Sequence, residues 1–156
     1  TVFNHEAGQR PERILLGLDE FCDVKCIFCR PENYKVNPNL IPKDKEDKLL
    51  EIISPWLTNA KYVKTNAVGE VFASKISREL IKNIAIKFPN IKFEIITNGI
   101  QCTKENIEEL NLTDRISMIT ISLHAFKEET YNKIVKGGNY KKVIENIKYI
   151  SYLLIF

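Results

Sequence analysis

The stretch "CDVKCIFC" places three cysteines, Cys22, Cys26 and Cys29, in a C-x3-C-x2-C spacing. The fourth cysteine of the chain, Cys102, lies far away in the sequence. Three thiolates from one loop can bind three corners of an iron–sulfur cube and leave the fourth iron without a protein ligand. An open metal position is typical of a catalytic centre, whereas a structural site closes all its positions. The spacing therefore predicts a catalytic four-iron centre at this loop.

Two other kinds of cysteine site fit the same stretch. A tetrahedral zinc ion would take Cys102 or His124 as its fourth ligand. A thioredoxin-like pair would use Cys26 and Cys29, but it leaves Cys22 without a role. We favour the cluster and keep a zinc-stabilised binding module without catalysis as the alternative. Otherwise Cys102 is expected to be a reduced, partly buried thiol, because free cysteine packs as a small apolar side chain.

The composition places these cysteines in a globular chain. Its 156 residues are enough for one domain with an apolar core. The formal net charge is +3, and the lysines are interleaved with acidic residues rather than gathered into a basic tract that would follow nucleic acid. No apolar run approaches the roughly 20 residues that a membrane span needs, and the N-terminus has no signal-peptide pattern. We therefore expect a cytoplasmic protein with reduced thiols and with neither a membrane nor a nucleic-acid partner.

The elements that must position the cysteine loop alternate between strands and helices. Short apolar runs predict four strands, at residues 13–18, 61–68, 91–97 and 115–123. Helical spacing follows each strand, at residues 49–57, 74–88, 103–110 and from 128 to about 150 with a pause at "KGGN". Such alternation predicts an α/β fold with a parallel sheet covered by helices.

Capping and helix-breaking residues mark the limits of the predicted helices. Ser74 and Ser77 both offer caps for the second helix, Thr103 can cap the third, and Asn139 can cap the segment that resumes at residue 140. Pro55 is expected to end or kink the first helix, or to open a short second one. Gly137 suits the position just after a helix, where a positive φ is common.

Residues able to bind a ligand follow all four predicted strands. The cysteine loop follows the first strand, "NAVGEV" with Gly69 and Glu70 the second, "TNG" with Thr97 and Asn98 the third, and "SLH" ends the fourth. Right-handed crossovers bring these loops to one edge of a parallel sheet, where active sites form. There, Glu70 could accept hydrogen bonds from the amine of a small molecule that chelates the open iron.

The chain resembles the radical S-adenosylmethionine (radical SAM) enzymes. Their signature is a C-x3-C-x2-C loop after the first strand with an aromatic residue before the last cysteine, a place that Phe28 fills. Gly69 and Glu70 match the family's second motif, whose acidic residue holds the methionine amine. "TNGI" after the third strand is also similar to the family. The segment of residues 121–150 is similar to fourth-unit sequences of the subgroup that usually carries a SPASM or twitch extension, and Ser122 matches a position that faces the ribose and methionyl portion.

The resemblance implies a partial (β/α) barrel with about four of the family's six βα units. Residues 1–12 are then an N-terminal extension and residues 13–156 an incomplete core domain, which need not be active alone. His124 stands where relatives often have Asp, and we expect it, with Thr97 and Asn98, beside the cofactor. Phe28 is expected to shield the cluster.

The activity implied is reductive cleavage of S-adenosylmethionine by a [4Fe-4S] cluster, which gives a 5′-deoxyadenosyl radical that removes hydrogen from a substrate. An external one-electron donor such as flavodoxin or ferredoxin is the implied partner, and the subgroup likeness points to a peptide or protein substrate. A degenerate domain that binds the cluster without turnover is a further alternative.

Overall fold

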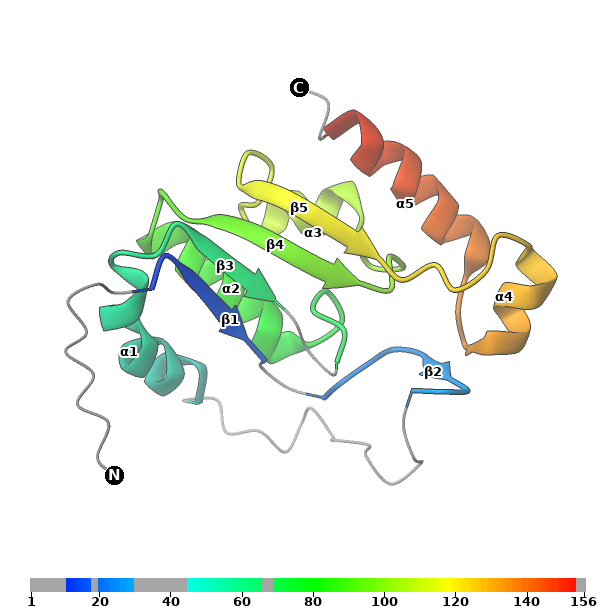
Figure 1. Cartoon of the computed structure of the whole chain (residues 1–156), viewed down its shortest axis with the longest axis horizontal. Helices are drawn as coiled ribbons and strands as arrows, with labels where there is room; N and C mark the ends of the chain where they lie inside the picture. Colours follow the sequence, from blue (N-terminus) through cyan, green and yellow to red (C-terminus); the bar gives the residue numbers. More distant parts are fainter. Residues whose placement is uncertain (1–10, 18–19, 30–44, 66–68, 154–156) are drawn as a thin grey trace.

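A four-stranded parallel sheet, ordered β1-β3-β4-β5, forms the centre of the fold (Figure 1). The computed structural model describes residues 11–17, 20–29, 45–65 and 69–153. The strands of this sheet are β1 (Arg13–Leu16), β3 (Tyr62–Thr65), β4 (Lys92–Thr97) and β5 (Ile116–Ile121). The predicted α/β fold with four parallel strands is confirmed.

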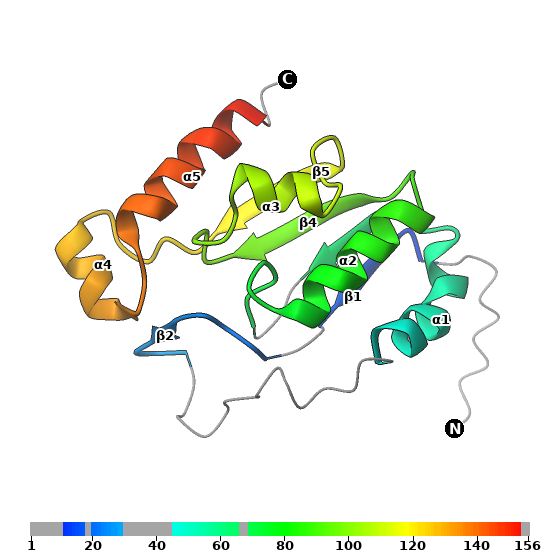
Figure 2. The same ribbon diagram turned by 180° about the vertical axis from the view of Figure 1, so that it is seen from behind.

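Five helices follow the strands in the described part of the chain. They are α1 (Lys45–Leu57), α2 (Lys75–Lys87), α3 (Lys104–Glu109), α4 (Glu128–Ile134) and α5 (Tyr140–Leu153). Helices α1, α2 and α3 lie together on one face of the sheet (Figure 2). Among the described residues, no helix combines the length and apolar character needed to cross a membrane.

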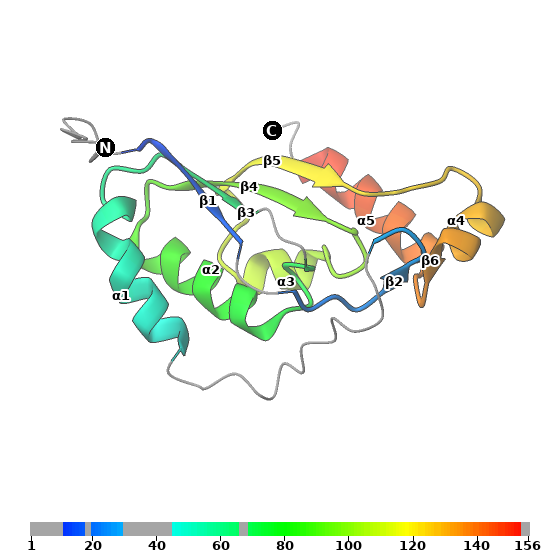
Figure 3. The ribbon, with the colours of Figure 1, turned by 60° about the horizontal axis from the view of Figure 1, so that its bottom comes forward.

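The main core fills the layer between the sheet and the helices. Val63, Phe93 and Ile95 alternate along β3 and β4 with residues of the other face, and all three are fully buried in this layer. On the opposite face, Leu15 and Met118 are 59% and 40% exposed, and no helix in the described ranges covers that face (Figure 3). This one-sided covering is what part of a (β/α) barrel presents, with helices outside and the strand side chains of the other face turned inward.

A second, two-stranded ribbon lies beyond the carboxyl end of the main sheet. Its strands are β2 (Lys25–Cys26) and β6 (Val135–Lys136), which pair antiparallel with Cys26 opposite Val135. The backbone N–H of Ile27 extends the pairing by donating to the carbonyl of Ile134 at 3.0 Å. The ribbon attaches the cysteine loop to the segment that joins α4 to α5, a connection that the sequence analysis did not predict.

The ribbon also corrects the position expected for Gly137. Helix α4 ends at Ile134 with Val135 as its cap, because Val135 and Lys136 leave the helix to pair with β2. Gly137 has a φ of +80° but lies in the turn between β6 and α5, not directly after a helix.

Of the two candidates for the second helix, Ser74 is the cap and Ser77 lies inside α2, while Thr103 and Asn139 are confirmed as caps. The side-chain oxygens of Ser74, Thr103 and Asn139 each accept from the backbone N–H three residues later, at 3.1, 3.3 and 3.0 Å. Pro55 does not end its helix, since α1 continues to Leu57. Pro55 lies in the last turn of α1, so its missing N–H removes only one hydrogen bond at the end of that helix.

Candidate cofactor site

The loops after β1, β3 and β4 meet at the carboxyl edge of the sheet, as the sequence analysis expected. The backbone N–H of Glu70 donates to the carbonyl of Phe21 at 2.6 Å, which joins the second loop to the first. The Asn98 Nδ2 donates to Asp23 Oδ1 at 2.8 Å and lies 3.9 Å from the Cys22 Sγ. The first and third loops are therefore joined beside the first cysteine.

The three clustered cysteines are free thiols that differ in exposure. Cys22 and Cys26 are half-buried, whereas Cys29 is exposed, and its backbone N–H donates to the Cys26 carbonyl at 3.1 Å in a tight turn. Burial raises the pKa of Cys22 to about 11, and burial followed by the charge of Cys29 raises the pKa of Cys26. These two thiols hold their protons at neutral pH, so a metal cluster that binds them must displace protons.

The zinc alternative finds no support in the described part of the chain. No group of three or more His, Cys, Asp or Glu side chains in these ranges is arranged to hold a metal ion. Cys102 is fully buried in the main core rather than partly buried as expected, and burial raises its pKa to about 12. A four-iron cube needs one protein sulfur at each of three different irons, whereas a zinc site needs several donors around one ion. A loop with three free thiols matches the first requirement.

Glu70 is the centre of a buried hydrogen-bond network. Its Oε1 accepts from the Thr97 hydroxyl at 2.6 Å and from the Phe72 N–H at 3.3 Å. Its Oε2 accepts from the Asn98 N–H at 2.6 Å, and the side chain of Thr97 in turn accepts from the Gly99 N–H at 3.0 Å. The carboxylate therefore fixes the turn after β4 to the loop after β3.

Burial sets the charge of this carboxyl group. Glu70 is 2% exposed, and the loss of hydration raises its pKa to about 7 despite the hydrogen bonds from Asn98, Thr97 and Phe72, which favour the anion. A buried carboxyl group with such a pKa gains stability from a nearby cation, because a positive charge offsets the lost hydration.

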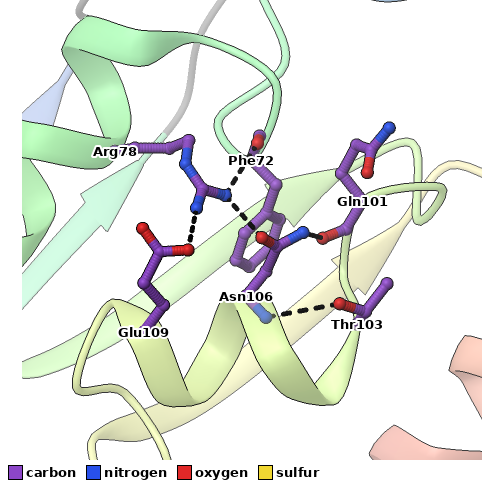
Figure 4. Close-up of polar contacts among 6 residues, drawn as sticks. All are labelled: Phe72, Arg78, Gln101, Thr103, Asn106 and Glu109. Carbon is purple, nitrogen blue, oxygen red and sulfur yellow. Dashed lines mark hydrogen bonds and ion pairs between the residues drawn. The ribbon is translucent and has the colours of Figure 1, made fainter.

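A second polar network holds the same two loops from the side of the helices (Figure 4). The Arg78 guanidinium donates to the Phe72 carbonyl at 3.2 Å, to Asn106 Oδ1 at 2.8 Å and to Glu109 Oε2 at 2.6 Å. The Asn106 Nδ2 donates to the Gln101 carbonyl at 2.7 Å. Arg78 in α2 thus connects the loop after β3 with α3 and with the segment that follows β4.

The remaining residues proposed from the sequence lie at two places. Phe28, 62% exposed, and His124 pack edge to face with ring centroids 4.9 Å apart, which brings the cysteine loop against the segment after β5. His124 takes a positive φ of 63°, unusual for a residue with a side chain. The Ser122 N–H donates to the Thr97 carbonyl at 2.9 Å, and Gly69 is half-buried in the bend that precedes Glu70.

Two residues of the site were not proposed from the sequence. Asp23 accepts the bond from Asn98 described above, and nothing in its spacing marks it. Asn146 in α5 is buried and donates through Nδ2 to the carbonyls of Gly99 and Ile100 at 2.7 and 3.0 Å. A signal for Asn146 existed, because it is a polar residue on the helix stripe that also carries Val143 and Ile150.

The turn held by Asn146 requires glycine at position 99. Gly99 has a φ of +83°, and a Cβ there would lie 2.9 Å from Ile121 Cγ2 and 3.2 Å from Val143 Cγ1. Backbone conformation and close packing both exclude a side chain. The turn after β4 is therefore rigidly placed by its neighbours on β5 and α5.

Comparison with known proteins places the chain beside enzymes of one superfamily. The family model for the radical SAM superfamily matches residues 19–151. The chain is 32% identical over 149 residues to the FeMo cofactor biosynthesis protein NifB of Methanocaldococcus infernus, covering 90% of this chain and 48% of the relative. It is 26% identical over 147 residues to the GTP 3′,8-cyclase of Clostridium botulinum, covering 90% of this chain and 44% of the relative.

A solved structure, described as TYW1 with a lysine-pyruvate adduct bound, aligns with a TM-score of 0.47 at 22% identity, covering 87% of this chain and 49% of that chain. The chain thus spans about half the length of the curated relatives that it matches. Enzymes of the matched superfamily use a [4Fe-4S] cluster and S-adenosylmethionine. On the family match and the sequence identities, the chain belongs to the radical SAM superfamily.

Proposed function

We propose that the protein is a radical SAM enzyme whose cluster is bound by Cys22, Cys26 and Cys29. One-electron reduction of S-adenosylmethionine by such a cluster supplies methionine and a 5′-deoxyadenosyl radical able to remove hydrogen from a substrate. The observation that carries the proposal is the attachment of the loop with three free thiols to the loops after β3 and β4. That attachment puts sulfur donors and a buried carboxyl group at one edge of the sheet.

Glu70 is proposed to receive the amine of the methionine portion. Its carboxylate accepts three hydrogen bonds from the protein, and a carboxylate has about four acceptor positions, so one further donor can be accommodated. A cationic amine would also offset the burial that raises the pKa of Glu70. Thr97 and Asn98 are also proposed to lie beside the cofactor, because both are hydrogen-bonded to Glu70.

Phe28 and His124 are proposed to bound the opposite side of the cofactor. Their rings contact each other across the cysteine loop and the segment after β5, so a shared aromatic wall can exclude water from the cluster. Ser122 is proposed to face the ribose and methionyl portion, because its N–H continues the sheet pairing beside Thr97. Gly69 is proposed to let the loop backbone approach the cofactor closely.

Two further parts of the proposal concern the cellular setting and the substrate. Free thiols of this kind fit a reducing cytoplasmic compartment, with flavodoxin or ferredoxin as the one-electron donor. A peptide or protein substrate is proposed from the sequence resemblance to the SPASM and twitch subgroup. The two named relatives act, by their names, in FeMo cofactor biosynthesis and on GTP, and both extend well beyond the matched region. The domain division at residues 12 and 13 is likewise proposed from the sequence.

Anaerobic reconstitution of the full-length protein tests the proposed function. We expect at least four irons and four sulfides per chain, a brown colour, and an electron paramagnetic resonance signal of a reduced [4Fe-4S] cluster after dithionite treatment. Addition of S-adenosylmethionine should change that signal and yield 5′-deoxyadenosine. A colourless, air-stable protein that contains zinc would overturn the proposal in favour of the binding module. A cluster without 5′-deoxyadenosine would indicate a domain that no longer turns over.

A further inference from the structure

The hydroxyl of Tyr131 is buried without a hydrogen-bond partner. Tyr131, in α4, is 0% exposed, and its hydroxyl is the buried side-chain polar atom in the described ranges for which no partner is found. A buried hydroxyl left unbonded costs about 1–3 kcal/mol. Native proteins rarely keep such a group unless a ligand or a bound water completes it.

This hydroxyl lies next to the cysteine loop. Tyr131, Val24 and Val135 belong to a small apolar cluster, separate from the main core, against which Cys22 and Cys26 pack. Cys26 is directly opposite Val135 in the two-stranded ribbon, and Val135 caps α4 by donating its N–H to the Tyr131 carbonyl. The ring of Tyr131 therefore lies in the apolar cluster against which the side chains of Cys22 and Cys26 pack.

The surroundings keep the hydroxyl protonated and in place. Burial is the main cause that raises the pKa of Tyr131 to about 12, with smaller contributions from Cys26 and Asp23, and the hydroxyl is a donor at neutral pH. At Gly138, an added Cβ would lie 2.9 Å from the Tyr131 hydroxyl oxygen and 2.8 Å from its Cε1. The glycine thus leaves the room that the tyrosine ring fills.

We propose that the Tyr131 hydroxyl donates a hydrogen bond to the sulfur of Cys26 when that sulfur ligates the cluster. A protonated thiol is a weak acceptor, whereas a thiolate bound to iron carries negative charge and accepts more strongly. The inference rests on the proposed function, since it requires the cluster. It explains why a hydroxyl is retained in an apolar cluster where phenylalanine would fill the same volume.

The hydrogen bond has a definite consequence for the cluster. Reduction adds one electron and makes the cluster more negative, so a donor to a ligating sulfur stabilises the reduced state more than the oxidised state. Hydrogen bonds to sulfur are one of the factors that set the potentials of such clusters. Tyr131 is thus a positioning residue for the electron-transfer step, which raises the reduction potential without contacting the substrate.

The test is a redox titration of the full-length, reconstituted protein, followed by electron paramagnetic resonance. We expect Tyr131→Phe to shift the midpoint potential of the cluster to a more negative value. Tyr140→Phe is the matched control, because Tyr140 packs against Tyr131 with ring centroids 5.4 Å apart but donates to the carbonyl of Phe126. The midpoint potential of the Tyr140→Phe variant should equal that of the wild type. Gly138→Ala, which crowds the hydroxyl, should shift the potential in the same direction as Tyr131→Phe.

Thermal unfolding provides a second readout that a merely structural role would not reproduce. In the cluster-free protein, Tyr131→Phe removes an unbonded buried hydroxyl and should raise Tm. In the cluster-loaded protein, that gain should disappear or reverse. An unchanged potential in Tyr131→Phe with a full cluster would overturn the inference and assign the hydroxyl to a buried water. Absence of a cluster in the wild type would instead overturn the proposed function.

Discussion

The two halves of the candidate site differ in how completely the protein satisfies them. Around Glu70, three protein donors bond to a buried carboxylate, and the bonds from Thr97 and Asn98 join the loop after β3 to the end of β4. Around Cys26, the polar groups are free thiols and a buried hydroxyl of Tyr131 that has no partner. The loop itself is anchored through the ribbon of two residues per strand and through the bonds of Phe21 and Asp23 to the neighbouring loops.

This difference indicates that the two halves form at different stages. A buried network with three protein donors keeps its shape without a ligand, even though one acceptor position of the Glu70 carboxylate stays open. In the cysteine half, the three thiols are free and the Tyr131 hydroxyl beside them has no partner, so we expect the binding of a metal cluster to complete this half. We therefore expect the Glu70 half to fold with the sheet and the cysteine half to be completed by the cluster.

The largest expected effect separates loading of the cluster from folding of the sheet. Cys29→Ala removes an exposed thiol, so the cluster-free protein should unfold at the wild-type temperature. The reconstituted variant should hold no [4Fe-4S] cluster and form no 5′-deoxyadenosine, because one iron loses its ligand. Iron and sulfide analysis with a thermal melt measures both properties.

Cys102→Ala is the matched control, with the opposite result expected. Cys102 is fully buried in the main core, so its loss should cost about 1 kcal/mol of stability by leaving a small cavity. Iron and sulfide content should stay at the wild-type value. Loss of the cluster in Cys102→Ala would show that the cluster depends on the main core, and would contradict the separation of the cysteine half of the site from the rest of the fold.

Glu70→Ala should weaken the sheet edge and the cofactor together. It leaves three buried donors without an acceptor, and we expect a loss on the order of 3 kcal/mol in the free energy of unfolding at pH 6. The dissociation constant for S-adenosylmethionine should rise by about 10- to 100-fold, as loss of one hydrogen bond to a charged group predicts. Iron content should not change.

Glu109→Ala is the control for this comparison, since Glu109 is a largely exposed acid that pairs with Arg78. Its loss should cost less than about 1 kcal/mol and leave cofactor affinity unchanged. Wild-type affinity in Glu70→Ala, measured by calorimetry on the loaded protein, would show that Glu70 only joins the loops.

The buried carboxyl group also predicts a pH dependence. The pKa of Glu70 is about 7 in the folded protein and near the ordinary 4.5 when unfolded. Between these values the folded state holds a proton that the unfolded state releases, so the free energy of unfolding falls as pH rises from about 4.5 to 7, by on the order of 3 kcal/mol. Glu70→Gln cannot titrate, and urea unfolding should show its stability rising relative to the wild type across this window. Parallel curves for the two proteins would argue against a raised pKa.

Sequence reasoning found the parts of the site that follow from parallel-sheet geometry. Once four βα units are recognised, the loops that carry Glu70 and Asn98 must meet at one edge, and they do. The ribbon of β2 and β6 could not be found, because two residues per strand leave no periodic pattern. The missing partner of Tyr131 was equally hidden, since it depends on which groups surround the hydroxyl in space.

The smallest effect concerns Asn146, whose side chain holds the turn after β4 from α5. Asn146→Ala leaves the buried carbonyls of Gly99 and Ile100 without a donor, so we expect a loss of about 2 kcal/mol and weaker binding of S-adenosylmethionine. Asn139→Ala on the same helix removes only an exposed cap and should cost about 1 kcal/mol with no change in affinity. Chemical unfolding and calorimetry separate the two variants. Equal affinities would mean that the bonds around Glu70 alone set the shape of this turn, and that its rigidity does not depend on α5.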